Sequence, residues 1–267
     1  MIFIKKLFTF FILISLGSQL FAKEEKDELL FYIGITMINP ISKLAKEFEK
    51  ENNCKIKILQ GGSQDLYNSI KTSRIGDLYL PGSISYREKH LQDGILLDAQ
   101  FVGYNKLAMV VKKGNPLNIK ADLNEFTNPK LKVVLGSVES GSVGNASKKV
   151  LTKFGNYQKA IYNALFLEPD SRNLTAAIKN NKADLILNWY ATTFWDDNYN
   201  YVEAIELDDE YSNKSILALN LLKTSKNVEL TKKFMKFASS KRGKDIFYYY
   251  GFLNDKEYKN FEKVELK

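Results

Sequence analysis

The stretch LLFYIGI (29–35), TMINPISKLAKEFEKENN (36–53) and CKIKILQ (54–60) decides the fold of this chain. LLFYIGI is an apolar run rich in strand formers, and CKIKILQ alternates as a half-buried strand does. Between them, apolar residues at 41, 44, 45 and 48 fall on one face of a helix. Asn39 and Pro40 supply an N-cap and a first-turn proline for that helix. The segment therefore predicts a strand–helix–strand unit.

The same pattern continues along the chain. GGSQDLYNSIKTS (61–73) predicts a glycine turn and a helix, and GDLYLPG (76–82) predicts a short strand. LKVVLGSVESGSVGNASKKVL (131–151) repeats the order of buried strand, Gly/Ser loop and helix, and SRNLTAAIKNNKADLILNWY (171–190) predicts a helix followed by a strand. Strands that alternate with helices in this way are typical of an α/β fold with a mostly parallel sheet. We expect two such halves, joined by long strands near 101–111 and 216–222.

The amino-acid composition limits the classes of function that this chain can have. The 267 residues are 45% hydrophobic and 26% charged, which is ordinary for a globular protein and provides ample core. One cysteine, Cys54, excludes an intramolecular disulfide and cysteine zinc sites. One histidine, His90, leaves no histidine cluster for a metal and would be needed by any Ser-His-Asp catalyst. We therefore expect neither a metal site nor a cofactor, and we interpret Cys54 as a core residue.

The N-terminus has the layout of an export signal. Residues 1–22 contain Lys5 and Lys6, an apolar run from Leu7 to Leu16 and a small residue at Ala22, which predicts a secretory signal peptide. An uncleaved membrane anchor is the alternative, although the apolar run is shorter than the roughly 20 residues of a spanning helix. Because no cysteine lies near the cleavage site, we expect a soluble periplasmic protein without a lipid anchor.

The positive charge does not point to nucleic acid. The formal net charge is +8, and loss of Lys5 and Lys6 lowers it to +6. The remaining lysines lie among acidic residues, without a basic stripe interleaved with aromatic residues. We interpret the charge as a solvated surface that also steers anions.

Three small-residue loops precede predicted helices: ITMINP (35–40), GGSQ (61–64) and SGSVG (140–144). Helix starts expose free N–H groups, and ligands of open α/β sheets bind at the carboxyl ends of the strands. Each loop taken alone is more typical of simple helix capping, but their repetition favours an anion site. Asp65 disfavours a nearby anion and is interpreted as stabilising its own helix from the solvent side. Arg172 could pair with an anion or lie on the surface.

These residues resemble a known family. The export segment and the stretches GITMINPISKLAKEFEKENNCKIKILQGGSQDLYNSI, GDLYLPGS, VGYNKLAMVVKKGNP, SGSVGNASKKVL and ADLILNWYATTFW are similar to periplasmic molybdate-binding proteins of ABC transporters. The resemblance implies a two-lobed type II periplasmic-binding-protein fold, with mixed sheets flanked by helices and a two-strand hinge. It assigns 23–102 and 217–267 to one lobe and 103–216 to the other. It also implies that a ligand is trapped in the cleft between the lobes.

The resemblance further implies which residues bind. Thr36 corresponds to the serine of the family's first loop, and Ser63 keeps the second serine while Gln64 replaces a glycine. Val143 supplies a backbone donor, and a further backbone donor falls at Asn173 or Leu174. The family's cleft tyrosine corresponds to Tyr190, with Trp189 as the alternative.

The sequence therefore predicts a monomeric binding protein, not an enzyme. It would capture a tetrahedral oxyanion, molybdate or tungstate, through hydroxyl and backbone N–H donors and deliver it to an ABC permease in the inner membrane. The alternative is a receptor of the same fold, adhesin-like, for another anion, a small organic acid or a phosphorylated ligand. A periplasmic enzyme is the third reading, although no loop places two carboxylates beside a nucleophile. The role of the tail at 254–267 stays open.

Overall fold

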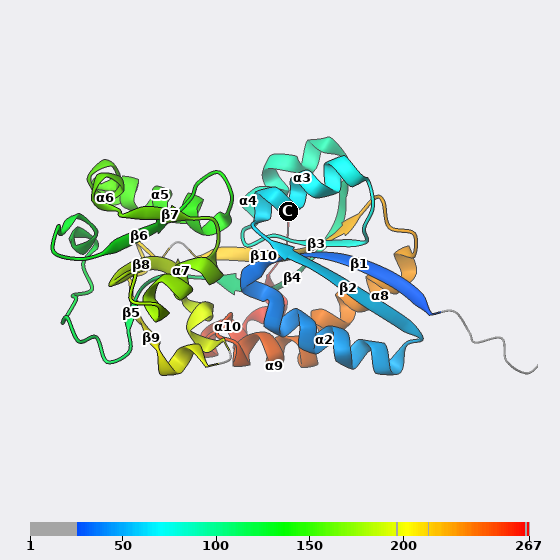
Figure 1. Cartoon of the computed structure of the whole chain (residues 1–267). Helices are drawn as coiled ribbons and strands as arrows, with labels where there is room; N and C mark the ends of the chain where they lie inside the picture. The colour runs from blue at the N-terminus through cyan, green and yellow to red at the C-terminus, as the bar shows by residue number, and fades with distance from the viewer. Residues whose placement is uncertain (1–25, 196, 213, 265, 267) are drawn as a thin grey trace, which may run out of the picture.

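The computed structural model describes residues 26–195, 197–212, 214–264 and 266. They form two lobes side by side, each built on a five-stranded sheet (Figure 1). The expected signal peptide, 1–22, lies outside the described residues. Within the described residues, no helix is long and apolar enough to cross a membrane, and no group of three or more His, Cys, Asp or Glu side chains could hold a metal ion.

Lobe 1 contains both ends of the described chain. Its strands follow the order β2-β1-β3-β10-β4, in which β1 pairs in parallel with β2 and β3, and β10 runs antiparallel to its neighbours. Its elements are β1 (Asp27–Gly34), α2 (Ile38–Glu51), β2 (Cys54–Gly61), α3 (Ser63–Ser73), β3 (Leu78–Leu80), α4 (Ser85–His90), β4 (Leu96–Asn105), β10 (Ser215–Leu222), α8 (Val228–Ala238), α9 (Lys241–Tyr249) and α10 (Asp255–Lys259).

Lobe 2 is a continuous insertion between β4 and β10. Its strands follow the order β7-β6-β8-β5-β9, with β6 parallel to β7 and β8, and β5 antiparallel to β8 and β9. Its elements are β5 (Leu107–Lys112), β6 (Val133–Gly136), α5 (Ser142–Phe154), α6 (Tyr157–Asn163), β7 (Phe166–Glu168), α7 (Ser171–Lys179), β8 (Leu185–Trp189) and β9 (Val202–Glu206).

Each lobe has its own core, as the helical periodicity predicts. In lobe 1, the predicted face of α2 is buried at Ile41, Leu44, Ala45 and Phe48. Phe48 packs edge-on against Phe234 of α8, with ring centroids 5.3 Å apart. The core of lobe 2 gathers the apolar residues of β5, β6 and β8 with the inner faces of α5 and α7. Two separate cores leave the lobes free to move as bodies about the segments that join them.

Two local predictions differ from the structure. Helix α2 begins at Ile38 with Met37 as its N-cap, so Asn39 lies inside the first turn and is not the cap. Pro40 lies in the first turn, as predicted, where a missing N–H costs nothing. The long strand expected over 101–111 is divided at Lys106 into β4 and β5, which belong to different sheets. The chain therefore changes lobe at Lys106, and again between Glu206 and Ser215. We predicted these changes at 102/103 and 216/217.

The two lobes have the architecture that the sequence predicts: two mixed sheets, flanked by helices and joined by two chain crossings. Figure 1 shows that the strand-to-helix loops of the two lobes face each other across the line where the lobes meet. Because β1 runs parallel to β2 and β3, and β6 runs parallel to β7 and β8, the carboxyl ends of these strands and the helix starts that follow gather at this line.

Candidate functional site

Strand-to-helix loops from both lobes line a small cavity of about 10 Å³, which is roughly the least space that holds one water molecule. Lobe 1 contributes Thr36 from the turn after β1, Gly62 and Ser63 from the start of α3, and Gly82 from the loop after β3. Lobe 2 contributes the start of α5 and the start of α7. The residues from these two helix starts are Gly141, Ser142, Val143, Asp170 and Ser171. We call this space the interlobe cavity.

Two helices point free N–H groups at the interlobe cavity from opposite lobes. The N-cap of α3 is Gly62 and that of α5 is Gly141, and neither cap makes a side-chain hydrogen bond to its helix. The N–H groups of both first turns therefore lack intrahelical and side-chain acceptors. They also carry the positive ends of two helix dipoles. Both helices are thus able to bind an anion, and the first turn of α5 contains no acidic residue.

Buried hydroxyl groups complete the donor set. The Oγ of Ser63 accepts the N–H of Gly82 at 3.0 Å, so its own hydrogen is free to donate to a ligand. The Oγ1 of Thr36 donates to the Oγ of Ser171 across the two lobes at 3.3 Å, which leaves the hydrogen of Ser171 free. The Oγ of Ser142 packs against Gly82, so that a Cβ added to Gly82 would lie 2.2 Å from this oxygen. All four hydroxyl-bearing residues are buried.

The lobes are in contact around the interlobe cavity, which is the closed arrangement of such a fold. The Nε1 of Trp195 donates to the carbonyl of Thr36 at 3.2 Å. The Nδ2 of Asn145 on α5 donates to the hydroxyl of Tyr86 on α4 at 3.2 Å. The guanidinium of Arg172 donates to the Oε1 of Gln60 at 3.1 Å, so this arginine bridges the lobes at the rim and does not line the cavity. Ligand entry therefore requires the lobes to separate.

A family of known function has this architecture. Residues 29–253 match the family described as bacterial extracellular solute-binding protein. The chain belongs to this family. Its members bind solutes, a transport function without catalysis, and they act outside the cytoplasm.

Three comparisons place this solute-binding protein among its relatives. A curated binding protein of Haemophilus influenzae is 23% identical over 134 residues, and the match spans 50% of this chain and 54% of that relative. The molybdate-binding protein of Azotobacter vinelandii superposes with a TM-score of 0.73 at 15% identity, covering 85% of this chain and 99% of its own. PEB3 of Campylobacter jejuni, solved with L-phospholactate, gives a TM-score of 0.66 at 18% identity, covering 85% and 99%.

Thr36, Ser63 and Val143 of the predicted site meet in the interlobe cavity of the solute-binding protein, but Asn173 and Leu174 do not line it. The reason is the cap of α7. The Oδ1 of Asp170 accepts the N–H groups of both Arg172 and Asn173 at 2.9 Å, and its carbonyl accepts that of Leu174 at 3.1 Å. The predicted backbone donors are thus already bonded within α7. Ser171, which the sequence reasoning missed, lines the cavity in their place.

Tyr190, which was predicted to bind the ligand, does not line this cavity. Tyr190 lines two larger cavities with Lys106 and Glu206, and its N–H donates to the carbonyl of Lys106 at 2.7 Å. Burial, together with the charge of Glu206, raises the pKa of its phenol. Because β8 ends at Trp189 and the chain then turns, Tyr190 lies next to the chain crossing at Lys106. The alternative, Trp189, is fully buried beside a neighbouring cavity and not in the interlobe cavity.

Asn188 positions the start of α7 and was also missed by the sequence reasoning. It is fully buried, and its Nδ2 donates to the carbonyl of Ser171 at 2.9 Å and to the Oγ1 of Thr175 at 3.0 Å. A polar residue inside an otherwise apolar strand was the available signal, because a buried amide needs partners.

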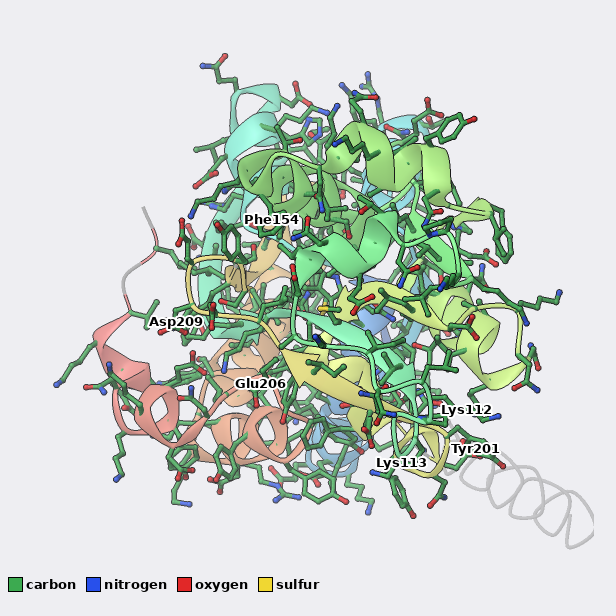
Figure 2. The ribbon with its side chains drawn as sticks, turned by 90° about the vertical axis from the view of Figure 1, so that its left-hand side faces the viewer. Lys112, Lys113, Phe154, Tyr201, Glu206 and Asp209 are labelled. Carbon is green, nitrogen blue, oxygen red and sulfur yellow. The ribbon has the colours of Figure 1, made fainter. Side chains whose placement is uncertain are left out.

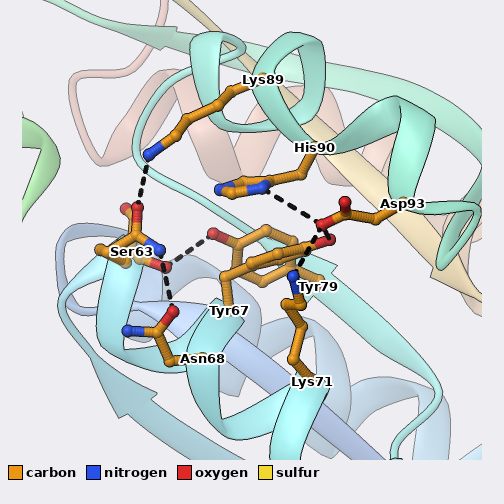
Figure 3. Close-up of polar contacts among 9 residues, drawn as sticks. Ser63, Tyr67, Asn68, Lys71, Tyr79, Lys89, His90 and Asp93 are labelled. Atoms are coloured by element: carbon orange, nitrogen blue, oxygen red, sulfur yellow. Dashed lines mark hydrogen bonds and ion pairs between the residues drawn. The ribbon is translucent and has the colours of Figure 1, made fainter.

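A packed aromatic cluster lies beside Ser63 (Figure 3). The hydroxyl of Tyr79 donates to the carbonyl of Ser63 at 2.7 Å, and Tyr67 lies between Tyr79 and His90. The His90 ring stacks on Tyr67 with centroids 3.8 Å apart, and both residues contact the carboxylate of Asp93. Burial and the neighbouring Lys89 lower the pKa of His90. His90 therefore has a packing role in this cluster and is not a member of the interlobe cavity.

Proposed function

We propose that this protein captures a tetrahedral oxyanion, molybdate or tungstate, in the interlobe cavity and delivers it to the permease of an ABC importer. One observation carries the proposal: two uncapped helix starts and four buried hydroxyls from opposite lobes converge on one small space. The described residues that line it include no lysine, arginine or histidine. Neutral, fixed donors of this kind replace the water shell of a small anion and make strong, charge-assisted hydrogen bonds.

The arrangement also couples binding to closure. Ser63 and the start of α3 belong to lobe 1, whereas Ser142 and the start of α5 belong to lobe 2. An anion that bonds to both sets favours the closed form over the open one, because the open form offers it only half of the donors. The closed form then presents a surface, assembled from both lobes, that a permease can recognise.

Titration calorimetry with molybdate, tungstate, sulfate and phosphate tests the proposal. We expect micromolar or tighter binding of at least one of these anions by the wild-type protein. Ser63→Ala should weaken binding by about 1–3 kcal/mol, because it removes a hydrogen bond to a charged ligand. Thr36→Val should weaken it by about 0.5–1.5 kcal/mol, because it removes the hydrogen bond to Ser171 that joins the two lobes. Ser69→Ala is the matched control, since Ser69 lies on the exposed face of α3 and its hydroxyl bonds only to the carbonyl of Asp65. Absence of heat with all four anions contradicts the proposal.

A second candidate is an oxyanion that carries an organic group. A cavity of about 280 Å³ shares Ser142 with the interlobe cavity and is also lined by Lys149 and Trp189. The Nε1 of Trp189 is buried and has no hydrogen-bond partner among the described residues, so it is available to a ligand acceptor. The L-phospholactate of the PEB3 structure is a ligand of this chemical class.

Calorimetry also separates the two candidates. If the ligand is a phosphorylated organic acid, L-phospholactate should bind more tightly than inorganic phosphate, and Trp189→Phe should weaken only the organic ligand. If the ligand is an inorganic oxyanion, Trp189→Phe should leave molybdate binding unchanged, since Trp189 does not line the interlobe cavity.

A further inference from the structure

Both chain crossings between the lobes carry a lysine, and one carboxylate binds both. Lys106 lies between β4 and β5, and Lys214 comes directly before β10. The Nζ of Lys106 is 2.8 Å from the Oε2 of Glu257, and the Nζ of Lys214 is 2.8 Å from its Oε1. Glu257 belongs to α10, near the C-terminal end of lobe 1. A single residue outside the interlobe cavity thus holds both parts of the hinge.

The carboxylate of Glu257 is held in a fixed position. Its side chain is only 8% exposed, and its Oε2 also accepts the N–H of Asn254 at 2.8 Å. The N–H of Glu257 donates back to the Oδ1 of Asn254 at 2.9 Å, which completes a capping box at the start of α10. Lys214 in turn lies over the ring of Tyr104, with its Nζ 3.9 Å from the centroid. The geometry of the hinge lysines is therefore determined by lobe 1.

The same crossings are bonded to lobe 2 through their backbones. The carbonyl of Lys106 accepts the N–H of Tyr190, and the N–H of Leu107 donates to the carbonyl of Ser212, both at 2.7 Å. A cavity of about 720 Å³ lies between α10 and the residues that follow β9, and Lys106, Lys214 and Glu257 all line it. Figure 2 shows Glu206 at the end of β9 and Asp209 in the segment that follows it. A rotation of lobe 2 relative to lobe 1 has to change the backbone torsion angles near Lys106 and Lys214, the two residues that pair with Glu257.

We propose that Glu257 is a positioning residue of the hinge: by pairing with Lys106 and Lys214 it favours the closed arrangement of the lobes and thereby raises ligand affinity without touching the ligand. Other ion pairs of the C-terminal region stay within lobe 1, such as Lys244 with Glu262 at 2.8 Å. Glu257 differs from them because its two partners lie on the segments that bend. The proposal depends on lobe closure and not on the identity of the ligand.

Distance measurement between the lobes tests this role without a ligand. Spin labels at Asn68→Cys on α3 and Glu139→Cys in the loop before α5, in a Cys54→Ala background, report how far the lobes separate; both labelled positions are exposed. Glu257→Gln keeps the capping box, because glutamine also serves at this position, and removes the charge. We expect Glu257→Gln to shift the distance distribution to longer values. Glu262→Gln, the matched control, should leave it unchanged.

Binding gives the second readout, with molybdate as the probe. Glu257→Gln should raise the Kd about tenfold, within the usual range of coupling between distant sites. Lys214→Gln, which keeps one of the two ion pairs, should show a smaller effect of the same sign. An unchanged distance distribution in Glu257→Gln overturns the proposal, as does an equal shift in Glu262→Gln. If the wild type binds none of molybdate, tungstate, sulfate and phosphate, the oxyanion proposal fails, and the distance measurement still decides the role of Glu257.

Discussion

Replacement of Gly62 by alanine should prevent full closure while leaving each lobe intact. The backbone of Gly62 has φ −66° and ψ 145°, a conformation that alanine adopts without strain. A Cβ at this position would nevertheless lie 2.3 Å from the carbonyl oxygen of Ser140, which belongs to the opposite lobe. Because the clash involves backbone and not a flexible side chain, the lobes have to separate to relieve it.

The size of the effect follows from this geometry. An ordinary carbon–oxygen contact needs roughly 1 Å more than the structure provides, so the lobes move apart by about that distance. This lengthens the bond from Thr36 to Ser171, now 3.3 Å, and the bond from Trp195 to the Thr36 carbonyl, now 3.2 Å, beyond hydrogen-bond range. Two neutral hydrogen bonds contribute about 1–3 kcal/mol in total. We therefore expect ligand affinity to fall roughly 5- to 150-fold in Gly62→Ala.

Calorimetry with the bound anion measures this loss, and thermal unfolding checks that the lobes remain folded. Gly61→Ala is the matched control, because its added Cβ would meet only Leu66 of its own lobe, at 3.6 Å. We expect Gly61→Ala to bind within about twofold of the wild type, since 3.6 Å is an ordinary contact distance. Equal affinities in Gly62→Ala and the wild type would refute the reasoning, because the closed arrangement would then not be the one that binds.

Three further predictions follow from the titrating and aromatic groups. Because burial disfavours the charged form of His90, its pKa lies below the usual value, and the protein should lose stability as the pH falls below about 6.5. NMR titration of this single histidine checks the pKa shift, and acid unfolding of His90→Gln checks the loss of stability. Burial tends to raise the pKa of Glu257, but the bonds to Lys106 and Lys214 outweigh burial and lower that pKa. The ionised Glu257 therefore stabilises the fold above about pH 4.5, and this contribution is lost as the pH falls through the lowered pKa. In that window, the stability of Glu257→Gln should depend less on pH than that of the wild type. Ligand binding should blue-shift tryptophan fluorescence, because closure buries Trp195 against the Thr36 carbonyl, and Trp195→Phe should remove most of that change.

The order of elements could be predicted because it depends on local periodicity. The predicted face of α5 is buried at Val143, Ala146, Val150 and Leu151, just as the spacing indicates. The division of the strand at Lys106 could not be predicted in the same way. An apolar run on both sides of one lysine is compatible with one strand or two, and only the pairing with separate sheets decides between them.

The site was predictable where a backbone pattern determines it and unpredictable where side-chain direction does. Thr36, Ser63 and Val143 each follow a strand of a parallel unit, so topology places Thr36 and Ser63 at the carboxyl edge of one sheet and Val143 at that of the other. At the start of α7, the predicted backbone donors would be free only if Asp170 did not cap its own helix. The Asp170 carboxylate does cap it, and it accepts the N–H groups of Arg172 and Asn173. At the end of β8 the outcome depended on which way the chain turns after Trp189, and this turn places Tyr190 outside the interlobe cavity.

The placement of Glu257 and of the neutral donors fits the two opposite demands on such a carrier. Tight capture favours a closed form that is already populated, because a rarely populated competent state reduces the apparent affinity in proportion. Release to a permease requires that closure be reversible. Among the described residues, few hydrogen bonds join the lobes around the interlobe cavity. Apart from the bond of Arg172 to Gln60 at the rim they join uncharged groups, as between Thr36 and Ser171, so they contribute little closure energy by themselves. The charged pairs act instead at the hinge, on Lys106 and Lys214, where they bias closure without adding a charge that would hold the anion too tightly.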